Sequence, residues 1–433
     1  MCIQLKGAHI YMKIAIIGAG STYTPELIEG IIGRKDKFPV TEIAMMDINK
    51  RKLDIVGGLT RRMVKAGEMG ATITTTNDLS QALHGASFVF SQIRVGMLPA
   101  RVLDEAIPKK YHLLGQETTG IGGFFKALRT VPVMMNIATE MTKHCPDAFM
   151  INFANPSGIN AQTLLNHTSI KMLGLCNAPI SMMSIAKRAL DIDDAELDYV
   201  GLNHLSVITS IRHAGRDYLR EAVAGNDEIL AKLSDACGFE KEDIRLIEGI
   251  PVGYMNYFLH PRRTLFKHLS DKTTRGQDCM VIEDDLLKMF QDEKLCVKPD
   301  ELSKRGGAMY SEAAVSLAES IYLDDGKIHI VNTLNNGAIP FMAPDDAVET
   351  RAYAGKNGAA TIPVQTSCNP LMQNIMCSVK TYERYTVTAA LNGCKTSAIR
   401  ALMANPLVQD MEIAIEAFEE MLQAHKEYLP QFF

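Results

Sequence analysis

The stretch MKIAIIGAGSTYTPELIEGII, residues 12–32, constrains the fold more than any other part of the sequence. Residues 14–17 form an apolar run without polar alternation, which predicts a parallel strand buried on both faces. Gly18 and Gly20 follow at once, and Pro25 suits the first turn of a helix. Because a strand that ends in G-x-G and enters a helix leaves backbone N–H groups free to bind an anion, the stretch predicts a site for a dinucleotide pyrophosphate.

The turn departs from the full dinucleotide fingerprint, because a third glycine is missing and the hydroxyls of Ser21 and Thr22 lie there instead. A second apolar run, residues 43–46, ends in Asp47, from which a carboxylate can accept hydrogen bonds from the ribose hydroxyls of NAD but would repel the 2′-phosphate of NADP. Asp47 could instead only cap the turn before Lys50. The order of strand, turn, helix, strand and acid favours NAD binding.

The elements that follow alternate between helices and strands. The patterns predict helices over 25–34, 48–67 and 78–84, and strands over 42–46, 71–75, 88–93, 148–153 and 171–175. Such alternation implies right-handed crossovers and a mostly parallel sheet. We therefore expect an α/β fold, with a Rossmann-like NAD-binding domain over residues 12–200, similar to that of lactate and malate dehydrogenases, preceded by an N-terminal extension, residues 1–11.

The pattern changes after residue 200. It predicts helices near 181–190, 227–235, 280–291 and 309–321, a strand over 327–333, and a last hundred residues that are largely helical, including an amphipathic stretch over 411–429. We expect residues 201–433 to form an α+β domain that closes the cleft, carries substrate and metal groups and joins subunits. The apolar face of the C-terminal helix favours a homodimer or homotetramer, although it could equally pack within one chain.

Charge and cysteine content exclude several classes of protein. The 433 residues carry a net charge of −5 with both signs mixed, so we expect no nucleic-acid partner. No apolar run reaches the roughly 18 residues that span a bilayer, and the N-terminus lacks a secretory signal, so we expect no membrane partner. Nine cysteines without C-x-x-C spacing indicate reduced thiols and a cytoplasmic protein.

Polar motifs follow five of the predicted strands. They are GAGSTYT after residue 17, Asp47 after 46, RVG after 93, NPSG after 154 and CNAP after 175. Since the carboxyl ends of parallel strands meet at one edge of a sheet, we expect these turns to line one cleft.

Cys176 and His204 are candidate metal ligands. Cys176 lies just past a predicted strand, and His204 lies in the loop-like GLNHLS. A thiolate and an imidazole together suit a divalent transition ion, and two protein ligands would leave positions open for a substrate's hydroxyls. A buried structural cysteine is the alternative, because two such residues 28 positions apart occur often by chance.

Eight motifs in order resemble family 4 of the glycoside hydrolases, and most closely its 6-phospho-β-glucosidases. They are GAGSTYTPEL, QIRVG, GQETTGIGGF, NFANPSG, GLCNAPI, GLNHLS, KRGGAMYS and KIHIVNTLNNGAI. The resemblance implies NAD and a divalent metal, usually manganese, as cofactors, and hydrolysis of a 6-phospho-β-glucoside such as cellobiose 6-phosphate to glucose 6-phosphate. It further implies oxidation, elimination, addition and reduction in place of the two-carboxylate mechanism.

The resemblance also assigns residues. Cys176 and His204 match the family's metal ligands. Tyr254 in IPVGYMNYF matches its base, with Tyr257 as the alternative, and Glu117 in GQETTG matches an acid that increases the basicity of that tyrosine.

Further residues match the substrate and cofactor contacts of the family. Arg101, Asn155 and Arg275 match contacts to the substrate and its 6-phosphate. Asn177 stands where members acting on α-linked substrates tend to carry aspartate, which favours a β-linked substrate. The cofactor residues are assigned as Gly18, Gly20, Ser21, Thr22, Asp47 and Arg94.

Other activities stay possible at this stage. Within the family, the alternatives are a 6-phospho-α-glucosidase or another α-glycosidase. From another class, a 2-hydroxy acid dehydrogenase would have a similar nucleotide domain, but the sequence offers no histidine–aspartate relay for it. A third alternative is an inactive NAD-binding regulator.

Overall fold

A computed structural model describes residues 11–305 and 310–433. Its largest element is a nine-stranded sheet in the order β13-β12-β11-β6-β5-β4-β1-β2-β3. The part from β3 to β6 is parallel and has the 3-2-1-4-5-6 order of a dinucleotide-binding fold. Its strands are β1 (Lys13–Ile17), β2 (Glu42–Met46), β3 (Thr72–Thr76), β4 (Phe88–Ser91), β5 (Phe149–Asn152) and β6 (Lys171–Gly174). All six overlap predicted strands. The expected N-terminal extension, residues 1–11, lies outside the described residues except for residue 11.

Helices cover both faces of this sheet, as the apolar run in β1 predicts. Ile14 and Ile16 pack in one core with α1, α2, α13 and α14, while Ala15 and Ile17 pack in another with α3, α5 and α6. Because successive side chains of a strand point to opposite faces, a strand buried on both faces must be apolar throughout. These helices are α1 (Thr24–Ile32), α2 (Lys50–Ala66), α3 (Leu79–Leu83), α5 (Gly120–His144), α6 (Ser157–His167), α13 (Arg275–Phe290) and α14 (Tyr310–Leu323). Two more follow strands of the sheet in the chain, namely α4 (Met97–Lys110) and α7 (Ala178–Leu190); α4 packs against α5 and α13, and α7 against α9 (Asp227–Cys237).

Three strands from the second half of the chain extend the same sheet. They are β11 (Ile328–Leu334), β12 (Ala347–Gly355) and β13 (Gly358–Thr361), paired antiparallel, and β11 joins β6 through Asn332 and Gly174. The sequence analysis predicted β11 but missed β12 and β13 in a stretch that it expected to be largely helical. The division into domains 12–200 and 201–433 stays a prediction. Residue 200 lies inside β7 (Glu196–Leu202), so this boundary would fall within a strand.

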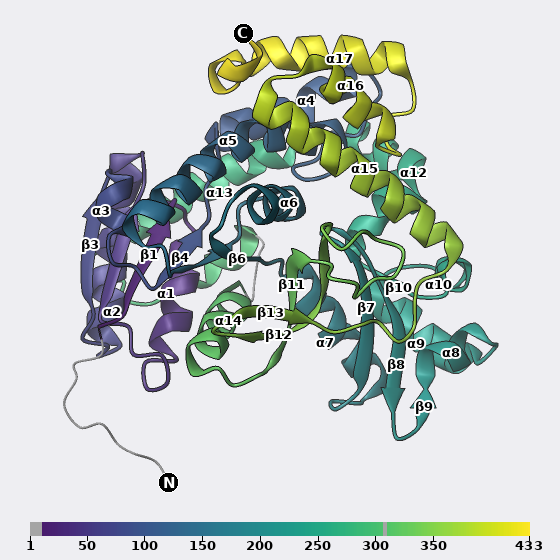
Figure 1. Cartoon of the computed structure of the whole chain (residues 1–433), viewed down its shortest axis with the longest axis horizontal. Helices are drawn as coiled ribbons and strands as arrows, with labels where there is room; N and C mark the ends of the chain where they lie inside the picture. Colours follow the sequence, from purple (N-terminus) through teal and green to yellow (C-terminus); the bar gives the residue numbers. More distant parts are fainter. Residues whose placement is uncertain (1–10, 306–309) are drawn as a thin grey trace.

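A smaller sheet is built from β7, β8 (Leu205–His213), β9 (Arg216–Asp217) and β10 (Ile250–Pro251). Figure 1 shows α15 (Pro370–Asn392) running from this sheet to the top of the molecule, where α16 (Lys395–Ala404) and α17 (Met411–Ala424) lie over α4 and α5. The other helices near the small sheet are α8 (Tyr218–Val223), α9 (Asp227–Cys237), α10 (Lys241–Ile247), α11 (Asn256–Leu259) and α12 (Pro261–Ser270).

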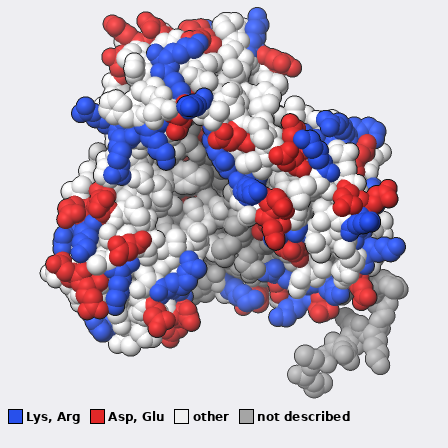
Figure 2. All heavy atoms as spheres, turned by 180° about the vertical axis from the view of Figure 1, so that it is seen from behind, with Lys and Arg blue, Asp and Glu red and all other residues white. Residues whose placement is uncertain are grey.

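The surface carries mixed charge. Figure 2 shows Lys and Arg interspersed with Asp and Glu on the face opposite that of Figure 1, and among the described residues of this face neither sign covers an extended area. Within residues 11–305 and 310–433, the structure contains no helix both long and apolar enough to cross a bilayer.

Candidate active site

The glycine turn after β1 fits a dinucleotide. Gly18 has φ +88°, and a Cβ there would lie 3.1 Å from the backbone of Gln92, so the close approach of the chain after β4 requires glycine. A Cβ on Gly20 would lie 2.8 Å from Oδ2 of Asp47. This oxygen accepts a hydrogen bond of 2.8 Å from the Gly20 amide, while Oδ1 accepts one from Asn49. Asp47 therefore holds the turn and also lies at the end of β2, where ribose hydroxyls would bind.

The hydroxyls beside this turn lie at different depths. Thr22 is fully buried, and its Oγ1 has no hydrogen-bond partner among the described residues. Ser21 is partly exposed, and its Oγ accepts a hydrogen bond from the amide of Tyr23. The Thr22 hydroxyl, which lies just before the N-terminus of α1, is therefore free to donate a hydrogen bond to a bound phosphate. The turn thus fits NAD, the cofactor that the sequence predicts.

Cys176 and His204 come together although 28 residues separate them. Sγ of Cys176, just beyond the carboxyl end of β6, lies 3.3 Å from Nε2 of His204, and both residues are buried. Asn203 and His204 form the two-residue turn between β7 and β8, and His204 has φ +65°, a conformation unusual for a residue with a side chain. Strain of this kind often marks a functional position.

The electrostatics of this pair suit a cation. Burial lowers the pKa of His204 to about 4, which keeps the imidazole neutral, the form that binds metals. Burial, and then the charge of Glu349, raise the pKa of the Cys176 thiol to about 12, and a bound divalent cation would displace its proton. No group of three or more His, Cys, Asp or Glu able to hold a metal occurs among the described residues. The two donors therefore fit an open site.

Tyr254 lies directly on this pair. Its ring stacks on His204 with centroids 4.0 Å apart, whereas Tyr257 is one ring further away, 6.4 Å from Tyr254. Burial, followed by the charges of Cys176 and Glu117, raises the pKa of Tyr254, while Tyr257 interacts with Glu105 and Arg101 instead. The geometry favours Tyr254 over Tyr257 as the group next to the metal ligands.

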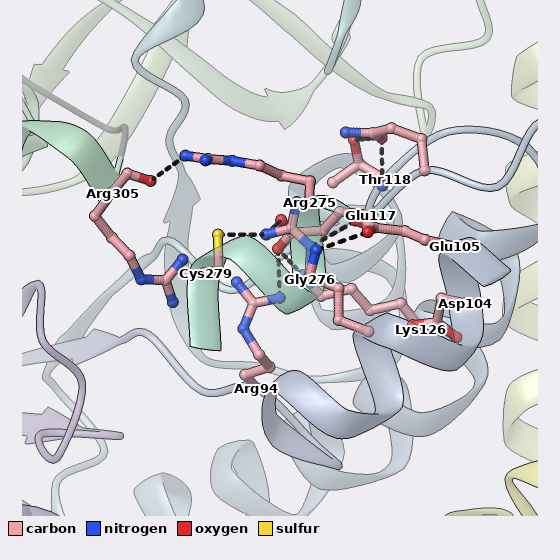
Figure 3. Close-up of polar contacts among 12 residues, drawn as sticks. Arg94, Asp104, Glu105, Glu117, Thr118, Lys126, Arg275, Gly276, Cys279 and Arg305 are labelled. Carbon is pink, nitrogen blue, oxygen red and sulfur yellow. Dashed lines mark hydrogen bonds and ion pairs between the residues drawn. The ribbon is translucent and has the colours of Figure 1, made fainter. Parts of the chain in front are cut away.

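Glu117 is surrounded by cations. Its carboxylate lies 2.6 Å from Nη1 of Arg94, 2.7 Å from Nη1 of Arg101 and 2.5 Å from Nζ of Lys126 (Figure 3). Burial alone would raise the pKa of Glu117, but the positive charges of Arg94, Lys126 and Arg101 hold it well below its ordinary value. Glu117 is therefore ionised, and its charge also acts on His204 and Tyr254.

Glu105 connects Arg101 with the start of α13. It accepts a 2.7 Å hydrogen bond from Nε of Arg101 and another of 2.7 Å from the amide of Gly276, beside Arg275 (Figure 3). Arg275 is exposed and donates to the carbonyls of Lys304 and Arg305. Glu105 thus holds Arg101 near the residue that follows Arg275, and guanidinium groups suit a phosphate.

Of the two predicted asparagines, Asn177 contacts a candidate metal ligand, whereas Asn155 lies beside a cavity that His204 lines. Asn177 follows Cys176, and its Oδ1 lies 3.9 Å from the thiol. Asn155 precedes Pro156, which lines a small cavity together with Asn203, His204, Tyr382 and Glu383. Both asparagines are half-buried.

The predicted residues fall into three neighbouring groups. The turn after β1 contains Gly18, Gly20, Ser21, Thr22 and Asp47. The metal-ligand group contains Cys176, His204, Tyr254 and Asn177. The ionic group contains Glu117, Arg94 and Arg101, with Arg275 at its edge. Arg94 was assigned to the cofactor, and in the structure it pairs with Glu117. Sequence reasoning missed Lys126 and Glu105, and the only signal for Lys126 is a lone cation in the apolar run GGFFKAL.

Comparisons with known proteins match nearly the whole chain. The model described as family 4 glycosyl hydrolase matches residues 13–192, and that of the family's C-terminal domain matches residues 199–408. A relative from Bacillus subtilis (strain 168), named probable 6-phospho-beta-glucosidase, is 40% identical over 98% of this chain and 98% of its own.

Solved structures agree with this match. The 6-phospho-beta glucosidase from Thermotoga maritima with manganese, NAD+ and glucose-6-phosphate has a TM-score of 0.88 at 33% identity, covering 96% of this chain and 99% of that one. Lactate dehydrogenase from Cryptosporidium parvum shares the fold alone, with a TM-score of 0.56 at 15% identity, covering 89% of this chain and 99% of that one. The predicted fold class is thereby confirmed.

Proposed function

The chain belongs to family 4 of the glycosyl hydrolases, and from this membership and the site geometry we propose that it hydrolyses 6-phospho-β-glucosides, such as cellobiose 6-phosphate, to glucose 6-phosphate. The observation that carries the proposal is the meeting of Cys176 Sγ and His204 Nε2 at 3.3 Å beneath the stacked ring of Tyr254. The Bacillus subtilis relative carries the name of this activity, and the Thermotoga maritima enzyme was solved with both expected cofactors and glucose-6-phosphate.

The proposal requires two cofactors, for which the chain offers donors. Gly18, Gly20 and Asp47 would hold NAD at the turn after β1, and Cys176 and His204 would hold a divalent cation, most simply manganese. NAD supplies a recyclable hydride acceptor, and the cation supplies Lewis-acid polarisation of a sugar carbonyl. Hydrolysis then proceeds without net redox change, by oxidation, elimination, addition and reduction.

Within this scheme the chain's own residues bind and move protons. The Tyr254 hydroxyl oxygen would accept the proton from C2 of the sugar, which becomes acidic once C3 is a carbonyl. A phenol has an ordinary pKa of ~10, and burial raises that of Tyr254 further; a cation held by Cys176 and His204 would lower it. Glu117 would add negative charge beside the reacting group, and Arg101, Arg275 and Asn155 would contact the sugar and its phosphate.

The proposal is tested by comparing a chromogenic 6-phospho-β-glucoside with the same β-glucoside lacking the phosphate, in the presence of NAD and Mn²⁺. We expect turnover only of the phosphorylated compound, without accumulation of NADH. Reaction in D₂O should place deuterium at C2 of the product. Equal turnover of both compounds, or stoichiometric NADH from a hydroxy acid, would refute the assignment. A faster 6-phospho-α-glucoside would contradict the β-preference that Asn177 supports.

We further propose a homodimer or homotetramer and a cytoplasmic location. Met411 and Ile415 on α17 are exposed apolar side chains that could join subunits. All cysteines among the described residues have free thiols, as a reducing compartment requires. Sedimentation analysis of the purified chain would test the oligomeric state.

A further inference from the structure

Glu349 on β12 is a buried carboxylate held only by neutral donors. It is 1% exposed. Oε2 accepts a hydrogen bond of 2.6 Å from the Tyr199 hydroxyl, and Oε1 accepts bonds of 3.0 Å from Asn203 Nδ2 and 3.2 Å from Asn332 Nδ2. Tyr199 is itself bonded to Ser206 Oγ, so the group is fixed by strands of both sheets.

No cation pairs with this carboxylate anywhere in residues 11–305 or in the described side chains that follow. Other buried carboxylates are paired: Asp104 lies 2.6 Å from Arg129, and Asp198 lies 2.8 Å from Arg351. A buried charge is costly unless a counter-charge or a metal compensates it, and burial accordingly raises the pKa of Glu349. The described residues therefore supply no positive charge that would balance the Glu349 carboxylate.

The missing charge is expected on the side of the metal ligands. Asn203, whose Nδ2 donates to Glu349 Oε1, directly precedes His204 in the two-residue turn between β7 and β8. Asn332, which also donates to Glu349 Oε1, lies opposite Gly174, two residues before Cys176. The carboxylate is thus held next to the segments that carry both candidate metal ligands, where a divalent cation would supply the missing positive charge.

We propose that Glu349 is a positioning residue that supplies the outer negative charge for a divalent cation held by Cys176 and His204, acting through Asn203 on the turn that carries His204. The inference rests on the proposed metal-dependent function. Groups behind the direct ligands orient them and tune affinity, and their loss typically weakens binding by about 10- to 100-fold.

The test is direct titration of the full chain with Mn²⁺, followed by the electron paramagnetic resonance signal of the free ion. We expect the Kd of Glu349→Gln to be at least about tenfold higher than that of the unmodified chain. Glu319→Gln is the matched control, because it removes a buried carboxylate that pairs with Arg34, just after α1; its Kd should not change. If the unmodified chain binds no Mn²⁺, the proposed function fails; if it binds but Glu349→Gln binds equally well, only the present inference fails.

Two further variants separate charge from shape. Tyr199→Phe removes one hydrogen bond but keeps the carboxylate charge, so its Kd should rise much less than that of Glu349→Gln. Asn203→Ala removes the link between Glu349 and the turn that carries His204 and should raise the Kd by about fivefold. If Glu349→Gln does not fold, Asn203→Ala still tests the proposal, because an unchanged Kd for Mn²⁺ in Asn203→Ala would overturn it.

Cobalt gives a spectroscopic check of the same site. With Co²⁺ at saturation, Glu349→Gln should keep the thiolate-to-metal charge-transfer band of the unmodified chain, since Cys176 still ligates. Loss of the band at saturation would show that Glu349 maintains the ligand geometry alone and would contradict a role for its charge.

Discussion

Replacing Glu117 by Gln should destabilise the protein strongly, because it removes the one carboxylate that Arg94, Arg101 and Lys126 share. The side chain of Arg94 is 24% exposed, so solvent compensates its charge in the variant. Arg101 keeps its hydrogen bond to the Glu105 carboxylate, which compensates its charge. Lys126 has a side-chain exposure of 4% and would lose its only ion pair among the described residues. Leaving one buried charge uncompensated costs about 3–5 kcal/mol, and we expect a value near ~3 kcal/mol in the free energy of unfolding.

The assay is urea unfolding followed by circular dichroism, with Glu140→Gln as the control. Glu140 pairs with the exposed Lys143, and such exposed pairs contribute little to stability. The double variant Glu117→Gln/Lys126→Met should recover much of the loss, since no uncompensated charge remains. A loss below ~1 kcal/mol for Glu117→Gln, or no recovery in the double variant, would refute the reasoning.

The same variant gives a pH dependence with a definite sign. The pKa of Glu117 is lower in the folded protein than in the unfolded chain, so its contribution is fully present above the ordinary carboxyl pKa and is lost as pH falls through the folded-state value. Burial lowers the pKa of Lys126 to about 7, so the effect of Glu117 is measured without Lys126. The difference in unfolding free energy between Lys126→Met and Glu117→Gln/Lys126→Met should be constant near neutral pH and shrink in acid. A difference that grows on acidification would contradict the assignment.

Three further substitutions test the other groups of the site. Cys176→Ser should abolish Mn²⁺-dependent turnover while leaving the melting temperature without metal within a few degrees; unchanged turnover would exclude the thiol as a ligand. Gly20→Ala places a Cβ 2.8 Å from Asp47 Oδ2 and should raise the Kd for NAD by about tenfold or more, measured by calorimetry. Tyr254→Phe should lower kcat by at least ~100-fold and stop deuterium incorporation at C2, whereas Tyr257→Phe should retain both, and the reverse result would exchange their roles.

The parallel part of the fold could be predicted because burial on both faces leaves a plain signal in the sequence. The run at 14–17 is apolar throughout, and both of its faces pack in cores. β12 carries no such signal, because Glu349 and Arg351 interrupt it. Both are buried: Glu349 accepts a hydrogen bond from Tyr199, and Arg351 pairs with Asp198, about 150 residues earlier in the chain. Polar contacts between residues so far apart leave no pattern in the local sequence.

The site divides in the same way. Cys176 and the turn at Gly18 could be predicted because each follows a strand of a recognisable parallel sheet, and His204 because it lies in the loop-like GLNHLS, which is also a motif of the family. Glu105 and Lys126 could not, since their significance lies in partners such as Arg101 that only the folded chain brings near.

The extension of the sheet has a chemical consequence as well as an architectural one. β11 pairs with β6 through Asn332 and Gly174, two residues before Cys176, and a Cβ on Gly174 would lie 2.9 Å from the Cβ of Asn332. Glycine at this position therefore lets β11 approach closely enough for Asn332 to reach Glu349 on the next strand. The strands that the later half of the chain adds to the nucleotide-binding sheet thus bring Glu349 next to Asn332, which lies opposite the strand that leads to Cys176. We therefore expect the proposed cofactor and metal sites to depend on one continuous sheet, which a boundary at residue 200 would divide.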